Sequence, residues 1–80
     1  MSATMLITYF AINFFGIATE RSETVSYANL DQCKNSLDIR YYKYNDSPNV
    51  IVDYKKKRDY LRIADKKNRT ATSFKCKKDN

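Results

Sequence analysis

The sequence predicts a small α+β domain, in which an antiparallel β-sheet packs against one main helix in the order ββα followed by further strands. Three observations support this class. The chain has 80 residues, near the lower size limit for an independent hydrophobic core. Several short segments alternate β-prone and polar residues between turn-forming residues. One stretch carries the start signal and spacing of an amphipathic helix. We expect a single domain over 1–80, divided into a β-hairpin (1–27), a helix (29–39) and a basic, strand-rich half (39–77).

The opening segment MLITYFAINFFGIATE, residues 5–20, is the longest apolar stretch, and three interpretations fit it. A membrane-spanning helix needs about 20 mostly apolar residues, and polar residues interrupt this stretch. A cleaved secretion signal would end at the small residues of 16–18, but the first residues carry no Lys or Arg. A β-strand is favoured, because Ile, Tyr, Phe and Thr suit a pleated surface and Gly16, the only glycine, then lies where the chain turns.

As a strand, this segment has two alternating faces. One face carries Leu6, Thr8, Phe10, Ile12 and Phe14, and the other carries Ile7, Tyr9, Ala11, Asn13 and Phe15. The first face is the more apolar, so we expect the second face to be the wetter one. Residues 22–27 then form a second strand that pairs antiparallel with the first across a loop near 16–21.

The clearest helix start lies at Asn29-Leu-Asp-Gln32. The Asn29 side chain can accept a bond from the Gln32 amide while Gln32 reaches back, in the manner of a capping box. Leu30, Cys33 and Leu37 follow at the i, i+3 and i+7 positions and form one apolar stripe. We therefore expect Cys33 to face the core.

The remaining segments alternate between strands and turns. IRYYKY (39–44) and VIVDY (50–54) are predicted to form a hairpin around the proline-containing turn NDSPN (45–49). KKKRD (55–59) is predicted to be an exposed connection, and YLRIA (60–64) fits either a strand or a short helix. TATSFKCK (70–77) is predicted to be a final strand with Phe74 and Cys76 on one face.

The two cysteines are both predicted to point inward, Cys33 from the helix and Cys76 from the final strand. A helix packed on a sheet can bring them within bonding distance, so a Cys33–Cys76 disulfide is favoured. The alternative is two buried thiols that act as small hydrophobic side chains. A structural zinc site is not expected, because it needs four N or S ligands and the chain has no histidine.

Enzyme chemistry is not expected from this sequence. The chain has no histidine to serve as a general base, and inward-facing cysteines are poor nucleophiles. A single glycine excludes a glycine-rich phosphate loop. We therefore expect no catalytic, cofactor-binding or metal-binding residue and no small-molecule substrate.

The formal charge of +6 is concentrated in one half of the chain. Residues 1–39 carry two basic and four acidic side chains, whereas 40–80 carry thirteen basic and five acidic ones. Such a basic half attracts anionic partners, although it also suits a solvated surface. The candidate binding residues are the basic ones of its first part and two tyrosines beside them: Arg40, Lys43, Lys55, Lys56, Lys57, Arg58, Arg62, Tyr54 and Tyr60.

The stretches LITYFAINFFG, VSYANLDQCKNSL and SFKC follow one another as strand, strand, helix with Cys33 and strand with Cys76. This order resembles small proteins common in tailed bacteriophages, including the cyanophage type that infects marine cyanobacteria. The resemblance implies a phage-encoded accessory protein located in the host cytoplasm or the virion. The chain departs from that pattern in its long basic insert, residues 39–69.

Three functional hypotheses follow. The preferred one is a non-enzymatic accessory protein that docks on a host or virion protein through its basic surface. The second is nucleic-acid binding by the Lys, Arg and Tyr side chains of 40–62. The third is a secreted or envelope protein, in which residues 1–18 form a signal or anchor and residues 3–18 contact the membrane.

Overall fold

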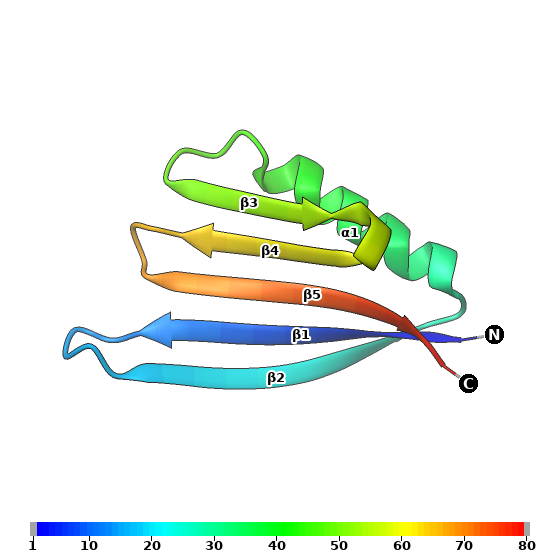
Figure 1. The fold of residues 1–80 in the computed structure, drawn as a ribbon, viewed down its shortest axis with the longest axis horizontal. Coiled ribbons are helices and arrows are strands. Elements are labelled where there is room, and N and C mark those ends of the chain that lie inside the picture. The colour runs from blue at the N-terminus through cyan, green and yellow to red at the C-terminus, as the bar shows by residue number, and fades with distance from the viewer. Residues whose placement is uncertain (1, 80) are drawn as a thin grey trace.

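The computed structural model describes residues 2–79, which form a five-stranded sheet with one helix across it. Along the chain the elements are β1 (Ala3–Ile12), β2 (Ala18–Tyr27), α1 (Leu30–Tyr44), β3 (Val50–Lys55), the 3₁₀ turn η1 (Lys56–Arg58), β4 (Tyr60–Asp65) and β5 (Thr70–Lys78). The strand order is β2-β1-β5-β4-β3, and every neighbouring pair is antiparallel (Figure 1). The predicted α+β class is confirmed.

The opening segment is an interior strand of this sheet. β1 pairs with β2 on one side and with β5, the last strand, on the other. Ala3, Met5 and Ile7 are buried, so β1 supplies three of the eight buried hydrophobic residues among positions 2–79. Within the described residues, no helix is both long and apolar enough to span a membrane.

The core lies between α1 and the sheet. Cys33 and Leu37 of α1 are fully buried against Met5, Leu61 and Phe74. The helix begins as expected, because the Gln32 N–H donates to the Asn29 side chain at 2.9 Å. The Gln32 side chain accepts in turn from the N–H of Ala28 at 3.3 Å. The predicted stripe of Leu30, Cys33 and Leu37 is confirmed as the inward face.

The prediction of a strand over 39–44 is wrong, because α1 continues to Tyr44. Tyr41 and Tyr44 extend the stripe by four and then three residues beyond Leu37. Tyr41 packs on Tyr54 of β3, with ring centroids 5.1 Å apart, so tertiary packing overrides the local β-propensity. The helix ends where the Asn45 N–H bonds the Tyr41 carbonyl at 2.8 Å. Consequently, β3 pairs with β4 and not with 39–44.

The two faces of β1 are also opposite to expectation. The alternate residues Ala3, Met5, Ile7 and Tyr9 face α1, while the more apolar set that includes Leu6 and Phe10 lies on the uncovered side. The register explains this, because Met5 lies directly opposite Cys76 and Ile7 opposite Phe74. Directly opposite residues share a face, and Cys76 must face the helix that it is bonded to.

A disulfide joins α1 to β5. Cys33 Sγ and Cys76 Sγ are 2.07 Å apart, and the two Cα atoms are 6.1 Å apart. The crosslinked residues are 43 positions apart in sequence. Because a long loop loses much conformational entropy when it is closed in the unfolded chain, such a bond contributes about 4 kcal/mol to the free energy of unfolding.

We therefore predict that the Cys33→Ala/Cys76→Ala variant loses about 3–4 kcal/mol of unfolding free energy, measured by urea denaturation. A thiol reductant should lower the stability of the wild type by a similar amount and leave the double variant unchanged. Equal stability of the oxidised wild type and the double variant would contradict the disulfide.

Candidate functional site

The sheet has a second face that nothing in the described residues covers. We call it the open face. It consists of the alternate residues of each strand that point away from α1, which lies behind the sheet in Figure 1. Its side chains form rows across the strands, because directly opposite residues share a face. They are Thr4, Leu6, Thr8, Phe10, Ile12, Ala18, Glu20, Ser22, Thr24, Ser26, Ile51, Asp53, Lys55, Tyr60, Arg62, Ala64, Ala71, Ser73, Lys75 and Lys77.

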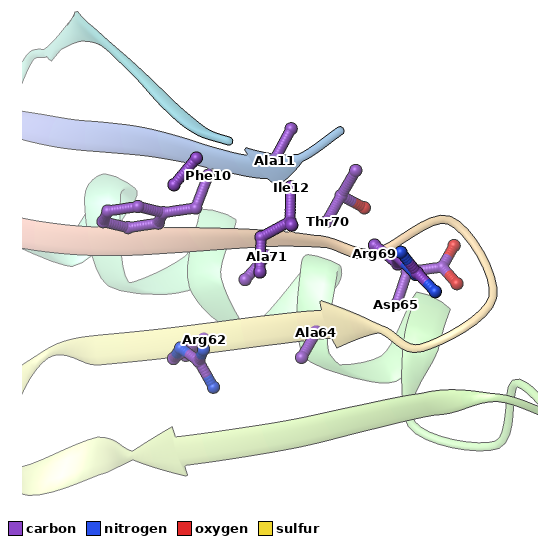
Figure 2. Close-up of a pocket in the computed structure, with 10 residues that line it drawn as sticks. Phe10, Ala11, Ile12, Arg62, Ala64, Asp65, Arg69, Thr70 and Ala71 are labelled. Atoms are coloured by element: carbon purple, nitrogen blue, oxygen red, sulfur yellow. The ribbon is translucent and has the colours of Figure 1, made fainter. Parts of the chain in front are cut away.

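One end of the open face is apolar. Phe10, Ala71, Ala64 and Ile51 lie opposite one another across β1, β5, β4 and β3. Ile12 adds an exposed aliphatic side chain beside this row. A shallow groove of about 580 Å³ lies at this end of the face (Figure 2). It is lined by the apolar residues Phe10, Ala11, Ile12, Ala18, Ala64 and Ala71 and by the polar residues Arg62, Asp65, Arg69 and Thr70.

The other end of the open face is basic. Lys55, Tyr60 and Lys75 lie opposite one another on β3, β4 and β5, so a lysine flanks the tyrosine on each side. Lys77 extends the positive charge along β5. Arg62 lies between the two ends, opposite Asp53 on one side and Ser73 on the other.

Three of the nine residues predicted as a binding site lie within this surface: Lys55, Tyr60 and Arg62. Three more predicted residues form η1, which connects the end of β3 to the start of β4: Lys56, Lys57 and Arg58. The ammonium of Lys75 donates to the carbonyl of Arg58, which ties η1 to β5. Lys56 also lies 3.8 Å from the carboxylate of Asp38 on α1.

The other three predicted residues lie on the α1 side of the molecule. The Arg40 guanidinium is 5.0 Å from the centre of the Phe74 ring and donates to Ser36. Lys43 lies over the ring of Tyr44 at 5.4 Å. Tyr54 packs between the sheet and α1, and its hydroxyl donates to Asp38. These three side chains therefore do not share a surface with the basic end of the open face.

Sequence reasoning missed Lys75, Lys77 and the apolar row. The alternation in SFKCKK was a sufficient signal for the lysines, since they are out of phase with the inward-facing Phe74 and Cys76. The apolar row has no comparable local signal, because Ile51, Ala64 and Phe10 come together only through the strand order.

Comparisons with protein-family models, with curated proteins and with solved structures found no match for this chain. The function proposed below is inferred from the fold and the side chains of this chain alone.

Tyr54 is part of the support beneath the site rather than of the site itself. Burial, followed by the hydrogen bond to Asp38, raises the pKa of the Tyr54 phenol above its ordinary value of 10.0. The unfolded chain therefore releases this proton at a lower pH than the folded protein does. Above about pH 10 the unfolded chain loses this proton while the folded protein keeps it, so the free energy of unfolding falls as the pH rises.

We predict that Tyr54→Phe makes the fall in unfolding free energy above about pH 10 shallower than in the wild type. Thermal melts monitored by circular dichroism between neutral and alkaline pH would measure it. Equal alkaline slopes for Tyr54→Phe and the wild type would contradict the assignment.

Proposed function

We propose that this protein is a non-enzymatic docking protein whose open face binds an acidic patch on a partner protein. The observation that carries the proposal is the composition of that face, in which an apolar row and a basic row are separated by a single row that contains Asp53, Arg62 and Ser73. Protein interfaces commonly combine an apolar centre with a polar rim, and an exposed apolar patch with such a rim marks an interaction surface.

The exposure of the apolar row supports this proposal. Leu6, Phe10, Ile12 and Ile51 are all exposed large hydrophobic residues on one face of the sheet. A single helix covers the other face, and the more apolar side of β1 is the side left in contact with solvent. Burial of this row against a partner would remove that apolar area from water.

The charge of the face defines the chemistry of the partner. Lys55, Lys75 and Lys77 lie on the same face as the apolar row, while Glu20 and Asp53 are the acidic residues of the face. A second copy of this chain would place like charges together and carries the same net charge of +6, so self-association through this face is disfavoured. The phage resemblance stays a prediction, and it would make the partner a host or virion protein.

A photo-crosslinking group at Phe10 tests the docking proposal. We expect benzoylphenylalanine at this position to give a discrete protein adduct in an extract of the natural host. The captured protein, once identified and purified, should bind the wild type and lose roughly tenfold or more in affinity for Lys55→Glu/Lys75→Glu, because two interfacial ion contacts become repulsive.

Two controls keep this experiment specific. Lys66→Glu/Lys67→Glu has the same net charge as the open-face variant but changes the β4–β5 turn, and it should bind the captured protein normally. The same crosslinker at Ile39, exposed on α1, should give no such adduct. Identical adducts from Phe10 and Ile39, or equal affinity of both charge variants, would overturn the proposal.

The second candidate function is single-stranded nucleic-acid binding by the basic end of the open face. The row Lys55, Tyr60, Lys75 favours it, because an aromatic ring between two cations offers a stacking surface with phosphate contacts on both sides. Lys77 and the η1 cations would extend the positive track.

For this candidate, we expect fluorescence anisotropy to show binding of a short single-stranded oligonucleotide that weakens steeply with salt. Tyr60→Ala should reduce the affinity by about 5- to 100-fold through the loss of stacking. Tyr42→Ala, which removes an exposed tyrosine from α1, is the control and should bind as the wild type does. No binding at low salt, or equal binding by Tyr60→Ala, would exclude this function.

A further inference from the structure

We propose that the loop between β1 and β2 is an anchor that inserts into an anionic lipid bilayer surface. The loop consists of residues 13–17, with the sequence NFFGI. The basic β4–β5 turn behind it, which contains Lys66, Lys67 and Arg69, would contact the lipid headgroups. This inference uses a different surface from the open face and does not depend on the proposed docking function.

The loop carries three exposed large hydrophobic residues, and no other connection in the described chain carries one. Phe14 is 91% exposed, Phe15 is 84% exposed and Ile17 is 60% exposed. The two rings contact each other edge to face, with centroids 5.8 Å apart. No part of the described chain covers them, so these side chains are available to an apolar medium.

The backbone of the loop holds these side chains outward. The Asn13 side-chain oxygen accepts from the N–H groups of Phe15 and Ile17, both at 2.9 Å. The Gly16 N–H donates to the Asn13 carbonyl at 3.0 Å, and Gly16 has a φ of 80° that other residues rarely adopt. The apolar side chains are therefore presented by a formed turn, and insertion would not require the loop to be ordered first.

The hairpin that carries the loop is braced on both sides. On one side, the Tyr9 hydroxyl donates to Glu23 at 2.6 Å, and the Arg21 guanidinium lies 4.9 Å from the centre of the Tyr9 ring. On the other side, the Ile12 N–H bonds the Arg69 carbonyl at 3.1 Å. Figure 1 shows the loop at one extreme of the long axis, beyond the neighbouring β4–β5 turn.

The charges around the loop fit an anionic surface. The first acidic residue of the chain is Glu20, so the whole of β1 and the loop itself carry none. The turn behind the loop carries Lys66, Lys67 and Arg69. Its one acid, Asp65, accepts from the N–H groups of Lys67 and Asn68 and from the Asn68 side chain, so it is directed into its own turn. The connection between α1 and β3 lies at the same end of the sheet and contains one acid, Asp46.

A lipid surface fits these features better than a protein pocket or a second copy. The loop is a convex projection that is backed by cations, which is the arrangement by which interfacial anchors combine apolar burial with attraction to anionic lipids. A second copy would bring the two basic turns together and repel. Capture by a pocket in a protein needs no flanking cations and is distinguished by the experiment below.

Sedimentation with large vesicles tests the proposal. We expect the full chain to bind vesicles of phosphatidylcholine with about 30% phosphatidylserine at roughly 0.15 M salt, and to bind pure phosphatidylcholine much more weakly. Phe14→Ser/Phe15→Ser should reduce partitioning about 100-fold, because two aromatic side chains no longer enter the bilayer. Lys66→Glu/Lys67→Glu should reduce it about 30-fold or more.

Matched variants separate insertion from general stickiness or charge. Ile39→Ser/Tyr42→Ser removes two exposed apolar side chains from α1, 68% and 76% exposed, and should bind the anionic vesicles as the wild type does. Lys55→Glu/Lys75→Glu matches the net charge of the turn variant and should lose far less binding. Circular dichroism checks that every variant is folded.

Two results would overturn the proposal. One is no binding of the folded wild type to the anionic vesicles. The other is that Phe14→Ser/Phe15→Ser binds the anionic vesicles as strongly as the wild type does. Binding would then be surface adsorption of a basic protein without insertion of the loop. If vesicles do not bind but the loop captures a protein by crosslinking at Phe14, the anchor is a protein-docking element and the lipid assignment is wrong.

Discussion

The bond between Cys33 and Cys76 sets which side of the sheet becomes the core. Because Cys76 must face α1, so must Phe74, two positions earlier on the same strand. The β1–β5 register passes this choice to Met5 and Ile7, which lie directly opposite them. Leu6 and Phe10 are thereby left on the other side, although their face of β1 is the more apolar. One covalent constraint thus determines both what the core contains and what the solvent-exposed face presents.

A five-stranded sheet has two faces, and a single helix can bury only one of them. α1 contacts all five strands, and its inward stripe closes the core around Leu37. The uncovered face keeps its apolar and basic rows in contact with solvent, and the β1–β2 loop extends past the end of the covered region (Figure 1). The open face and the β1–β2 loop are both exposed because the single helix does not cover them. Phe10 on the open face and Phe14 in the loop therefore cannot reach the core.

Local signals in the sequence predict the parts of this fold that are decided locally. The Asn29–Gln32 cap, the apolar stripe through Leu37 and the alternation in the last strand all predict the observed elements. The end of the helix could not be predicted in this way, because contact between Tyr41 and Tyr54 decides it. The same holds for the open face, whose rows depend on the strand order. Of the predicted site residues, Arg40 lies apart from the basic end of the open face for a similar reason, since Phe74 comes beside it only in the folded chain.

The position of β5 has a consequence for synthesis of the protein. β5 comes last among the strands, yet it lies between β1 and β4 in the middle of the sheet. While the ribosome is still adding its residues, β1 and β4 have no neighbour to join them, and the nascent chain presents unpaired strand edges. The β1–β2 and β3–β4 hairpins can form as the chain emerges, but the sheet closes only after β5 has been synthesised, so unpaired strand edges persist until then.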